Sequence, residues 1–412
     1  MGGPVMPLPL EGVVVLDLSR ALAGPFCTAL LADMGATVFK VESVDGGDSS
    51  RSWPPFEGTH SLYFDSVNRG KQSIAVNFRS DAGRALLRRM ALSVDVVVEN
   101  FRAGVMADLG LDPDDLRAEK PELVVASITG FGATGPLSRA PGFDQVAQGM
   151  SGIMSITGRN SEDIFRVGLP IIDTVSGIFC ALGIASALAG RGVTGRGASV
   201  ATSLLESAIA ISTFQGQQYL SRGEIPHPHG NDHPVLAPYG VFATADIPII
   251  VAVGNQEQWR SLCEVLGLSE LMEHPHFESG SSRSTHREDL KNRIEARLLA
   301  RSGTEWVTML QSAQIPCGPI YTYDQVFDDP QVKALDMVTD LHRDDGSRLP
   351  LIRGPLSVNG SATPVPGIPP ALGQDTREIL RALHFTEAEI TDLERARTVQ
   401  PHPEPLAAGS QG

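Results

Sequence analysis

Apart from the thiol of Cys180, Asp173 is the only ionisable side chain in the long apolar run from Val167 to Gly190. An isolated carboxylate in such a run is costly, so its placement usually has a structural or chemical reason. At the start of a helix a carboxylate caps free N–H groups, and the helix dipole holds it ionised. With water excluded, the same carboxylate is a usable nucleophile. Asp173 therefore predicts a helix cap, a nucleophile or both, and its spacing alone does not decide between them.

The same run allows a third interpretation, a membrane span, because apolar runs of about 18 residues or more can cross a bilayer. Pro170 and Asp173 interrupt the run and leave a continuous part that is too short to span comfortably. That part has the length of a buried helix in a soluble protein. We therefore expect a helix from Thr174 to about Leu188, capped by Asp173.

Two short clusters combine cations with amides, residues 68–71 (Asn-Arg-Gly-Lys) and residues 100–102 (Asn-Phe-Arg). Each cluster lies in a turn beside an expected strand. Cations and amides at the strand ends of an α/β sheet are placed to meet anionic ligands. The alternative for each cluster is ordinary solvated loop charge.

Residues 130–135 match G-x-G-x-x-G just after an expected strand, which is a pattern of dinucleotide binding. Pro136 and the pair Pro141 and Gly142 leave no room for the long helix that a pyrophosphate needs. No acidic residue follows at the end of a second strand, where a ribose would bind. We therefore expect a loop that approaches some other ligand, and no NAD.

Three histidines, His227, His229 and His233, lie close together beside Asp232. A metal site is conceivable in such an arrangement. The prolines and glycine among them favour a surface segment between domains instead, so the sequence predicts no metal.

Composition limits the partners of the chain. Its 412 residues carry a formal net charge of −15, which argues against nucleic acid or an anionic membrane as the main partner. An anionic ligand would need a local basic pocket. The four cysteines are scattered without C-x-x-C, which fits a reducing compartment. The N-terminal residues lack the pattern of a secretory signal, so we expect a cytoplasmic protein.

Apolar runs and helix signals alternate along the first part of the chain, which predicts an α/β fold with a doubly wound parallel sheet. We expect strands at 12–18, 36–41, 73–78, 94–98, 123–128 and 198–202, and helices at 26–34, 81–92 and 203–219. Residues 221–238, rich in Pro, His and Gly, separate a large domain, 8–220, from a small domain with linkers, 221–330. Residues 401–412 are expected to form a loose tail.

Several weak motifs occur together in one order. They are residues 15–25, 35–42, 67–74, 98–104, 128–136, 168–173, 315–320, 329–332 and 372–376. In this order and spacing the chain resembles the class III CoA-transferase family, of the formyl-CoA transferase and carnitine CoA-transferase type, over almost its whole length. It looks most similar to members that pass CoA from succinyl-CoA to dicarboxylates.

The resemblance implies an α/β fold with a Rossmann-like large domain and a small α/β domain. Residues 331–400 return to the large domain, and two chains form an interlocked homodimer. It also implies that Asp173 is the nucleophile, which forms a mixed anhydride with the acyl group and then a thioester with CoA. Coenzyme A thioesters and small carboxylic acids are the expected substrates, with no permanently bound cofactor. Nucleic acid and membrane are not expected partners.

The resemblance also assigns site residues. CoA contacts are expected at Arg20, Leu22, Ala23, Asn68, Lys71, Asn100, Phe101, Arg102, Phe143 and Asp144. Substrate contacts are expected at Arg51, Arg166, Gly254, Asn255 and Gln256. The last three would offer N–H groups to the oxyanions. Because a dicarboxylate needs a partner for its second charge, we expect at least one of Arg20, Arg51 and Arg166 to bind it.

Two positions depart from the family pattern. Many members carry a basic residue where this chain has Ser43 or Asp108. The sequence therefore does not show which residues hold part of the CoA phosphates. The first alternative activity, racemisation of 2-methylacyl-CoA, uses a histidine where this chain has Phe143, and a phenyl ring cannot move a proton. The second alternative is a non-catalytic CoA-binding protein, which would require Asp173 to be inert.

Overall fold

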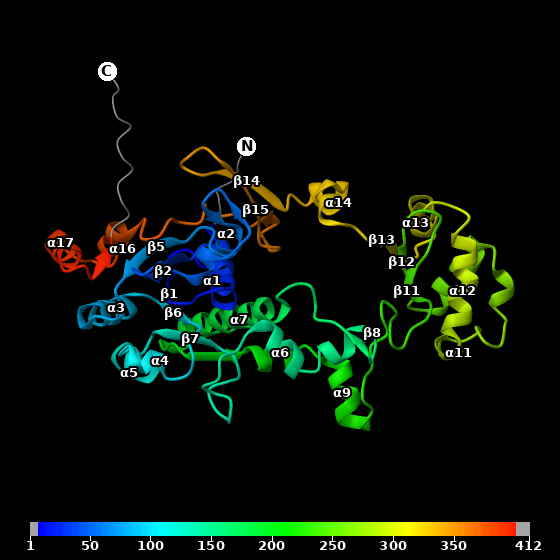
Figure 1. Cartoon of the computed structure of the whole chain (residues 1–412), viewed down its shortest axis with the longest axis horizontal. Coiled ribbons are helices and arrows are strands. Elements are labelled where there is room, and N and C mark those ends of the chain that lie inside the picture. The colour runs from blue at the N-terminus through cyan, green and yellow to red at the C-terminus, as the bar shows by residue number, and fades with distance from the viewer. Residues whose placement is uncertain (1–6, 401–412) are drawn as a thin grey trace, which may run out of the picture. The chain divides into compact units, whose positions relative to one another are not determined.

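The computed structural model describes residues 7–400, so the expected loose tail lies outside the described residues (Figure 1). The chain forms two compact units. The large unit holds the residues up to Ile153, Val167–Arg222 and the residues from Asp336 onward. The small unit holds Met154–Arg166 and Gly223–Leu335. The expected boundaries at 220 and 330 lie near these, but Met154–Arg166, expected in the large domain, belongs to the small unit.

A seven-stranded sheet forms the centre of the large unit. In spatial order its strands are β10 (Ser199–Ser203), β7 (Val124–Thr129), β6 (Val96–Glu99), β1 (Val14–Asp17), β2 (Thr37–Ser43), β5 (Gln72–Val76) and β18 (Val399–Gln400). The first six are parallel, and β18 runs antiparallel to β5. Counted along the chain, the parallel strands have the order 3-2-1-4-5-6 of a doubly wound fold. Such a sheet binds ligands where the order reverses, which here is between β1 and β6.

Helices cover both faces of this sheet. Successive residues of a strand point to opposite faces, so Val15 packs with one layer and Leu16 with the other. The first layer contains α1 (Ala23–Asp33), α6 (Asp144–Met150), α7 (Ile171–Thr194) and α8 (Leu204–Ala210). The second contains α3 (Asp81–Ser93), α4 (Val105–Asp108), α5 (Pro113–Glu119), α16 (Thr376–Ala382) and α17 (Glu387–Arg395). In Figure 1, α1 and α7 lie side by side.

Helix α7 differs from its expected form at both ends. It begins at Ile171 rather than Thr174 and continues to Thr194, where Gly195 ends it in a left-handed conformation. By length and composition α7 could cross a membrane. One face of it is nevertheless packed into the core, with Cys180 and Ile184 fully buried. A core helix of a soluble protein has the same composition.

The expected helix at 203–219 is two helices, α8 and α9 (Thr213–Arg222). Ser203 caps α8 by accepting a hydrogen bond from Glu206 N at 3.1 Å. The chain then turns, and Thr213, the first residue of α9, has a positive φ of 42°. A right-handed helix cannot pass through this conformation, so α8 and α9 are not continuous. Apolar content alone did not reveal this break.

Shorter elements complete the large unit. They are η1 (Ser49–Ser52), β3 (Phe56–Glu57), β4 (His60–Ser61), α2 (Leu62–Val67), β14 (Val338–His342), β15 (Arg348–Ile352), β16 (Ser357–Val358) and β17 (Ser361–Ala362). The antiparallel hairpin of β14 and β15 was not predicted. Helix α17 begins with a capping box, in which Thr386 and Glu389 are bonded to each other's backbone N–H.

The small unit is built on an antiparallel sheet of β11 (Tyr239–Phe242), β12 (Ile249–Ala252) and β13 (Cys317–Pro319). Its helices are α10 (Gln256–Leu266), η3 (Ser269–Leu271), α11 (Gly280–Thr285), α12 (Arg287–Leu298), α13 (Gly303–Ser312), α14 (Tyr323–Asp328) and α15 (Pro330–Ala334). Trp259, Phe277 and Trp306 belong to its separate core. The segment Met154–Arg166 contributes η2 (Met154–Ile156), β8 (Gly158–Asn160) and β9 (Asp163–Ile164).

Candidate active site

A cavity of about 290 Å³ opens in the large unit at the point where the strand order reverses. The segments after β1, β6 and β7 line it, together with residues 138–143 and the start of α7. Many of the residues predicted to bind CoA meet here: Arg20, Leu22, Ala23, Asn100, Phe101, Arg102 and Phe143. Asp173 lies in the same wall. The sheet therefore brings the predicted nucleophile and most of the predicted CoA residues together.

Asp173 is not the cap of α7. It is the third residue of the helix, and Pro170 takes the cap position without a side-chain hydrogen bond. Burial, together with the negative charge of Asp144, raises the pKa of Asp173 to about 7. The expectation that the helix N-terminus holds this carboxylate ionised is therefore wrong. Near pH 7 about half of the Asp173 side chains are protonated.

Asp144 on α6 takes the capping role. Its Oδ1 accepts hydrogen bonds from the N–H groups of Ile172, at 2.7 Å, and Asp173, at 3.3 Å. Its Oδ2 accepts one from Gln148 Nε2 at 2.6 Å. Asp144 was predicted to contact CoA, and in the structure both of its oxygens are bonded to protein groups. A contact of Asp144 with CoA stays a prediction.

The loop after β1 is held under strain. Ala21 has a φ of +66°, a conformation that is unfavourable for a residue with a Cβ. Asn100 fixes the neighbouring Arg20 by accepting from its N–H at 2.8 Å and donating to its carbonyl at 2.7 Å. Asp48 accepts a hydrogen bond from Ala21 N at 3.1 Å. Asn100 therefore positions the backbone of Arg20 beside the cavity.

A buried charge network lies beneath this loop. Lys71 Nζ is 2.9 Å from Asp17 Oδ2 and 3.0 Å from Asn68 Oδ1, and Lys40 Nζ is 2.9 Å from Asp48 Oδ2. The pKa of Asp17 stays well below its usual value because Lys71 and Lys40 outweigh the effect of its burial. Burial lowers the pKa of Lys71 to about 8, against the attraction of Asp17. The pairing offsets desolvation penalties of several kcal/mol per ion.

Asn68 and Lys71 therefore belong to the buried network that holds the loop after β1 in place. Both are almost fully buried and bonded to protein groups, and neither lines the cavity. Their predicted contact with CoA stays a prediction. The signal that sequence reasoning missed is the presence of Asp17 and Lys40 inside apolar strands, since buried charges of this kind need partners.

The three candidate arginines for a distal carboxylate have different surroundings. Arg51 is bonded to Glu42, with Nε to Oε2 at 2.7 Å and Nη2 to Oε1 at 2.6 Å. Arg166 belongs to the small unit. Arg20 lines the cavity of Asp173, with its guanidinium 5.3 Å from the centre of the Phe101 ring. Within residues 7–400, neither Arg20 nor Arg102 has an ion pair with an acidic side chain.

The predicted oxyanion loop lies in the small unit. Gly254 N donates to Gln258 Oε1 at 2.8 Å, and Asn255 caps α10 by accepting from Gln258 N at 2.9 Å. Gln256 donates to Glu278 O and accepts from Arg283. The N–H of Gly254 is thus already bonded within the protein. The role of this loop in oxyanion binding stays a prediction.

Two aromatic residues of the site were not singled out from the sequence. Trp53 lines the cavity, and its ring meets that of Tyr63 edge to face at a centroid distance of 5.0 Å. Burial raises the pKa of Tyr63, and the charges of Asp173, Asp144 and Asp48 raise it further. The phenol of Tyr63 is therefore protonated at neutral pH. Trp53 lies in a Pro-rich loop and Tyr63 in the short helix α2, and neither segment is long enough to give a periodic signal.

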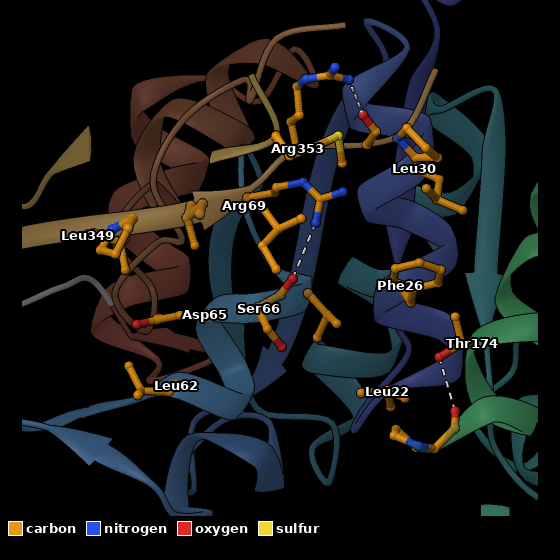
Figure 2. Close-up of a pocket in the computed structure, with 18 of the residues that line it drawn as sticks. Leu22, Phe26, Leu30, Leu62, Asp65, Ser66, Arg69, Thr174, Leu349 and Arg353 are labelled. Carbon is orange, nitrogen blue, oxygen red and sulfur yellow. Dashed lines mark hydrogen bonds between the residues drawn. The ribbon is translucent and has the colours of Figure 1, made fainter. Parts of the chain in front are cut away.

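A second, larger cavity of about 860 Å³ adjoins the first and shares Leu22 with it (Figure 2). Its wall is mainly apolar, with Phe26 and Leu30 from α1 and Leu349 from β15. Its charged groups are already paired within the protein. Arg69 binds Asp33, with Nη2 to Oδ2 at 2.5 Å, and Asp65 binds Arg343 at 2.8 Å. The cavity thus offers apolar surface but no carboxylate free to react.

The loop at 130–135 has no long helix after it; turns follow instead. Gly130 and Gly142 approach so closely that a Cβ on Gly130 would lie 2.7 Å from Gly142 Cα. Both glycines line the cavity of Asp173, so their closeness shapes its wall. Within residues 7–400, no group of three or more His, Cys, Asp or Glu side chains could hold a metal ion.

Comparison with known proteins assigns the family. Residues 10–376 match the family described as CoA-transferase family III. The chain belongs to CoA-transferase family III. It is therefore a CoA-transferase, as the sequence motifs predicted, and enzymes of this family use CoA thioesters as substrates.

Individual relatives agree with this membership. The chain is 36% identical over 397 residues to succinate–glutarate CoA-transferase of Agrobacterium fabrum, covering 95% of this chain and 98% of the relative. It is 36% identical over 364 residues to acetyl-CoA:oxalate CoA-transferase of Acetobacter aceti, covering 88% and 92%. A solved structure of a CaiB/BaiF family protein from Brucella suis superposes with a TM-score of 0.81 at 36% identity, covering 92% and 100%.

Proposed function

We propose that this family III CoA-transferase moves CoA from an acyl-CoA, such as succinyl-CoA, to a dicarboxylic acid, and that Asp173 carries the covalent intermediates. The observation that carries the proposal is a carboxyl group with a pKa of about 7 in a cavity that also holds two unpaired guanidinium groups. The carboxyl supplies a nucleophile near neutral pH. The guanidinium groups supply partners for anionic substrates.

The proposed reaction is balanced without an external reagent. The Asp173 carboxylate attacks the thioester carbonyl, the C–S bond breaks, and a mixed anhydride and the CoA thiolate form. The thiolate then attacks the Asp173 carbonyl of the anhydride, which releases the donor acid and leaves an aspartyl-CoA thioester. The acceptor carboxylate attacks this thioester, and the same two steps run in reverse onto the new acid. Dividing one exchange into two easier steps is covalent catalysis.

Several features of the large unit support roles in this reaction. Arg20 and Arg102 line the cavity on the side of Phe101, where one guanidinium can meet a CoA phosphate and the other a substrate carboxylate. The relatives named above act on glutarate and oxalate, which are both dicarboxylates. Phe143, which is 66% exposed in the cavity, offers no proton for the alternative racemase reaction. No metal or permanently bound cofactor has a part in the proposed steps.

A transfer assay tests the proposal. The purified protein is incubated with succinyl-CoA and a panel of unlabelled acids, and new CoA thioesters are identified by mass spectrometry. We expect glutaryl-CoA or another dicarboxyl-CoA to form with release of succinate. Hydrolysis to free CoA without transfer to any acid would contradict the proposed function.

We further propose that the protein acts as an interlocked homodimer in the cytoplasm. Helix α7 exposes a row of apolar side chains, Ile178 (46%), Phe179 (37%) and Leu182 (61%), which a second chain would cover. The large unit is assembled from three separate parts of the chain, which is compatible with threading. The four cysteines are free, as a reducing compartment requires.

The expected dimer is one that does not exchange subunits under native conditions, because threaded chains separate only after unfolding. Tagged and untagged dimers are mixed, and mixed species are followed by affinity capture and native mass spectrometry. A sample refolded together from denaturant is the positive control for exchange. Mixed dimers that appear within minutes of native mixing would rule out interlocking.

A further inference from the structure

Helix α6 holds the segment that carries Asp173 at two places. At one, Asp144 Oδ1 accepts the N–H groups of Ile172 and Asp173. At the other, Gln148 Oε1 accepts the N–H of Val167 at 2.9 Å. The side chain of Gln148 is fully buried and joins the two places by donating to Asp144 Oδ2. The start of α7 is thus capped from another helix rather than from its own sequence.

The identity of the capping group has a chemical consequence. A carboxylate at a helix N-terminus gains from the free N–H groups and from the dipole. Here Asp144 takes the N–H groups of Ile172 and Asp173, so Asp173 is deprived of them. Asp144 also adds a like charge beside Asp173. Both effects disfavour the ionised form of Asp173.

We propose that Asp144 is a positioning residue that fixes Asp173 for attack and, through its negative charge, favours the uncharged acyl forms of Asp173 over its ionised form. This inference rests on the proposed function. The anhydride and the aspartyl-CoA thioester carry no charge at the Asp173 side chain, so the repulsion from Asp144 is relieved when either forms. Gln148 takes part by fixing the second oxygen of Asp144.

Other charged and titratable groups face Asp173 and set its titration together with Asp144. Tyr63 on α2 is close enough that the charge of Asp173 raises its pKa, although burial is the larger cause. Arg20 and Arg102 line the same cavity from the ends of β1 and β6. Of these groups, only Asp144 raises the pKa of Asp173 through its charge, and burial contributes more. Removing the charge of Asp144 should therefore lower the pKa of Asp173 only in part.

The variant Asp144→Asn removes the charge and keeps the cap, because its amide oxygen still accepts the two N–H groups. Its NH2 group cannot accept from Gln148 Nε2, so that hydrogen bond is lost with the charge. We expect the acid limb of the pH profile of kcat/KM, centred near pH 7 in the native enzyme, to move down by about one unit. We also expect kcat/KM above pH 8 to fall severalfold, since a less basic carboxylate is a weaker nucleophile. The matched control is Asp114→Asn, the same change on the exposed start of α5.

A second measurement needs no turnover. With γ-¹³C-labelled aspartate, the Asp173 resonance is assigned by its loss in Asp173→Asn, and its titration gives the pKa directly. We expect a lower pKa for Asp173 in Asp144→Asn and an unchanged one in Asp114→Asn. This readout holds even if the protein transfers no CoA, so failure of the proposed function and failure of this inference are distinguishable.

The variant Asp144→Ala removes cap and charge together and serves as the structural comparison. We expect it to lose thermal stability, by about 1 kcal/mol for a missing cap, while Asp144→Asn loses less. A folded Asp144→Asn protein in which the Asp173 titration and the acid limb both stay where they are in the native enzyme would overturn the inference.

Discussion

Asp173→Asn should reduce kcat/KM for CoA transfer by about 10³-fold or more, because an amide is not a nucleophile toward a thioester. The side chains of Asp and Asn have almost the same shape, and the cap of α7 comes from Asp144, so the start of the helix should stay intact. Initial rates with succinyl-CoA and glutarate measure the effect. Asp114→Asn again controls for the same substitution away from the cavity.

The same variant should be more stable than the native protein above pH 7. The pKa of Asp173 is about 7 in the folded protein and 3.8 for a free aspartate side chain, so the folded state holds this proton more tightly. The stabilising effect of that proton is complete below pH 3.8 and is lost as pH rises through 7. An asparagine never ionises, so it avoids a penalty on the order of 2–4 kcal/mol at pH 8.

Denaturant unfolding at pH 8 and at pH 4 measures this difference. We expect the variant to unfold at higher denaturant than the native protein at pH 8, and the two to be nearly equal at pH 4. Gain of stability with loss of activity is the pattern of a strained functional group. Near-normal turnover of the Asp173→Asn variant would contradict the covalent mechanism, whatever the stability of the variant.

Arg20→Met should raise the KM for dicarboxylate acceptors by about 10- to 100-fold while sparing monocarboxylates of similar length. Of the three arginines considered, Arg20 is the one that lines the cavity of Asp173, and Arg51 is already bonded to Glu42. Methionine keeps much of the apolar length and removes the charge. The measurement compares KM for glutarate and for valerate in the native and variant enzymes.

Three further variants make this test selective. Arg79→Met repeats the substitution at a surface arginine that is 86% exposed, and should change neither KM. Arg51→Met should lower stability by breaking its pair with Glu42, without changing the ratio of the two KM values. Arg102→Met tests the other unpaired guanidinium. If the native enzyme uses glutarate and valerate equally and Arg20→Met leaves the ratio of the two KM values unchanged, Arg20 does not bind the distal carboxylate.

The sheet and the place of the site could be predicted from the sequence because they depend on local patterns. Apolar runs such as 94–98 and 123–128 predicted the strands β6 and β7. The order of the parallel strands is the 3-2-1-4-5-6 order that is typical of doubly wound folds. Asp173 was visible as a lone carboxylate in an apolar run. Arg20 and Asn100 were visible beside strand ends.

The environment of these residues could not be predicted, because it depends on contacts between distant parts of the chain. The cap of α7 comes from Asp144, which is 29 positions away from Asp173 in the sequence. No local pattern reveals that Asp144 takes the N–H groups on which the expected ionisation of Asp173 depended. Lys71 was visible as a cation beside a strand, but its pairing with Asp17 appears only when both are buried together.

The most direct test of the central claim is to trap CoA on Asp173. The protein is incubated with succinyl-CoA, quenched in acid and digested with trypsin. Cleavage after Arg166 and Arg191 gives the peptide 167–191, in which Asp173 is the only side-chain carboxyl group. Treatment with a phosphine reductant removes any disulfide of CoA with Cys180 and spares a thioester, whereas hydroxylamine removes the thioester. We predict an adduct with the mass of CoA less water on this peptide, stable to reductant, released by hydroxylamine and absent in Asp173→Asn. Normal transfer with no adduct on this peptide, or with the adduct on another residue, would contradict the account.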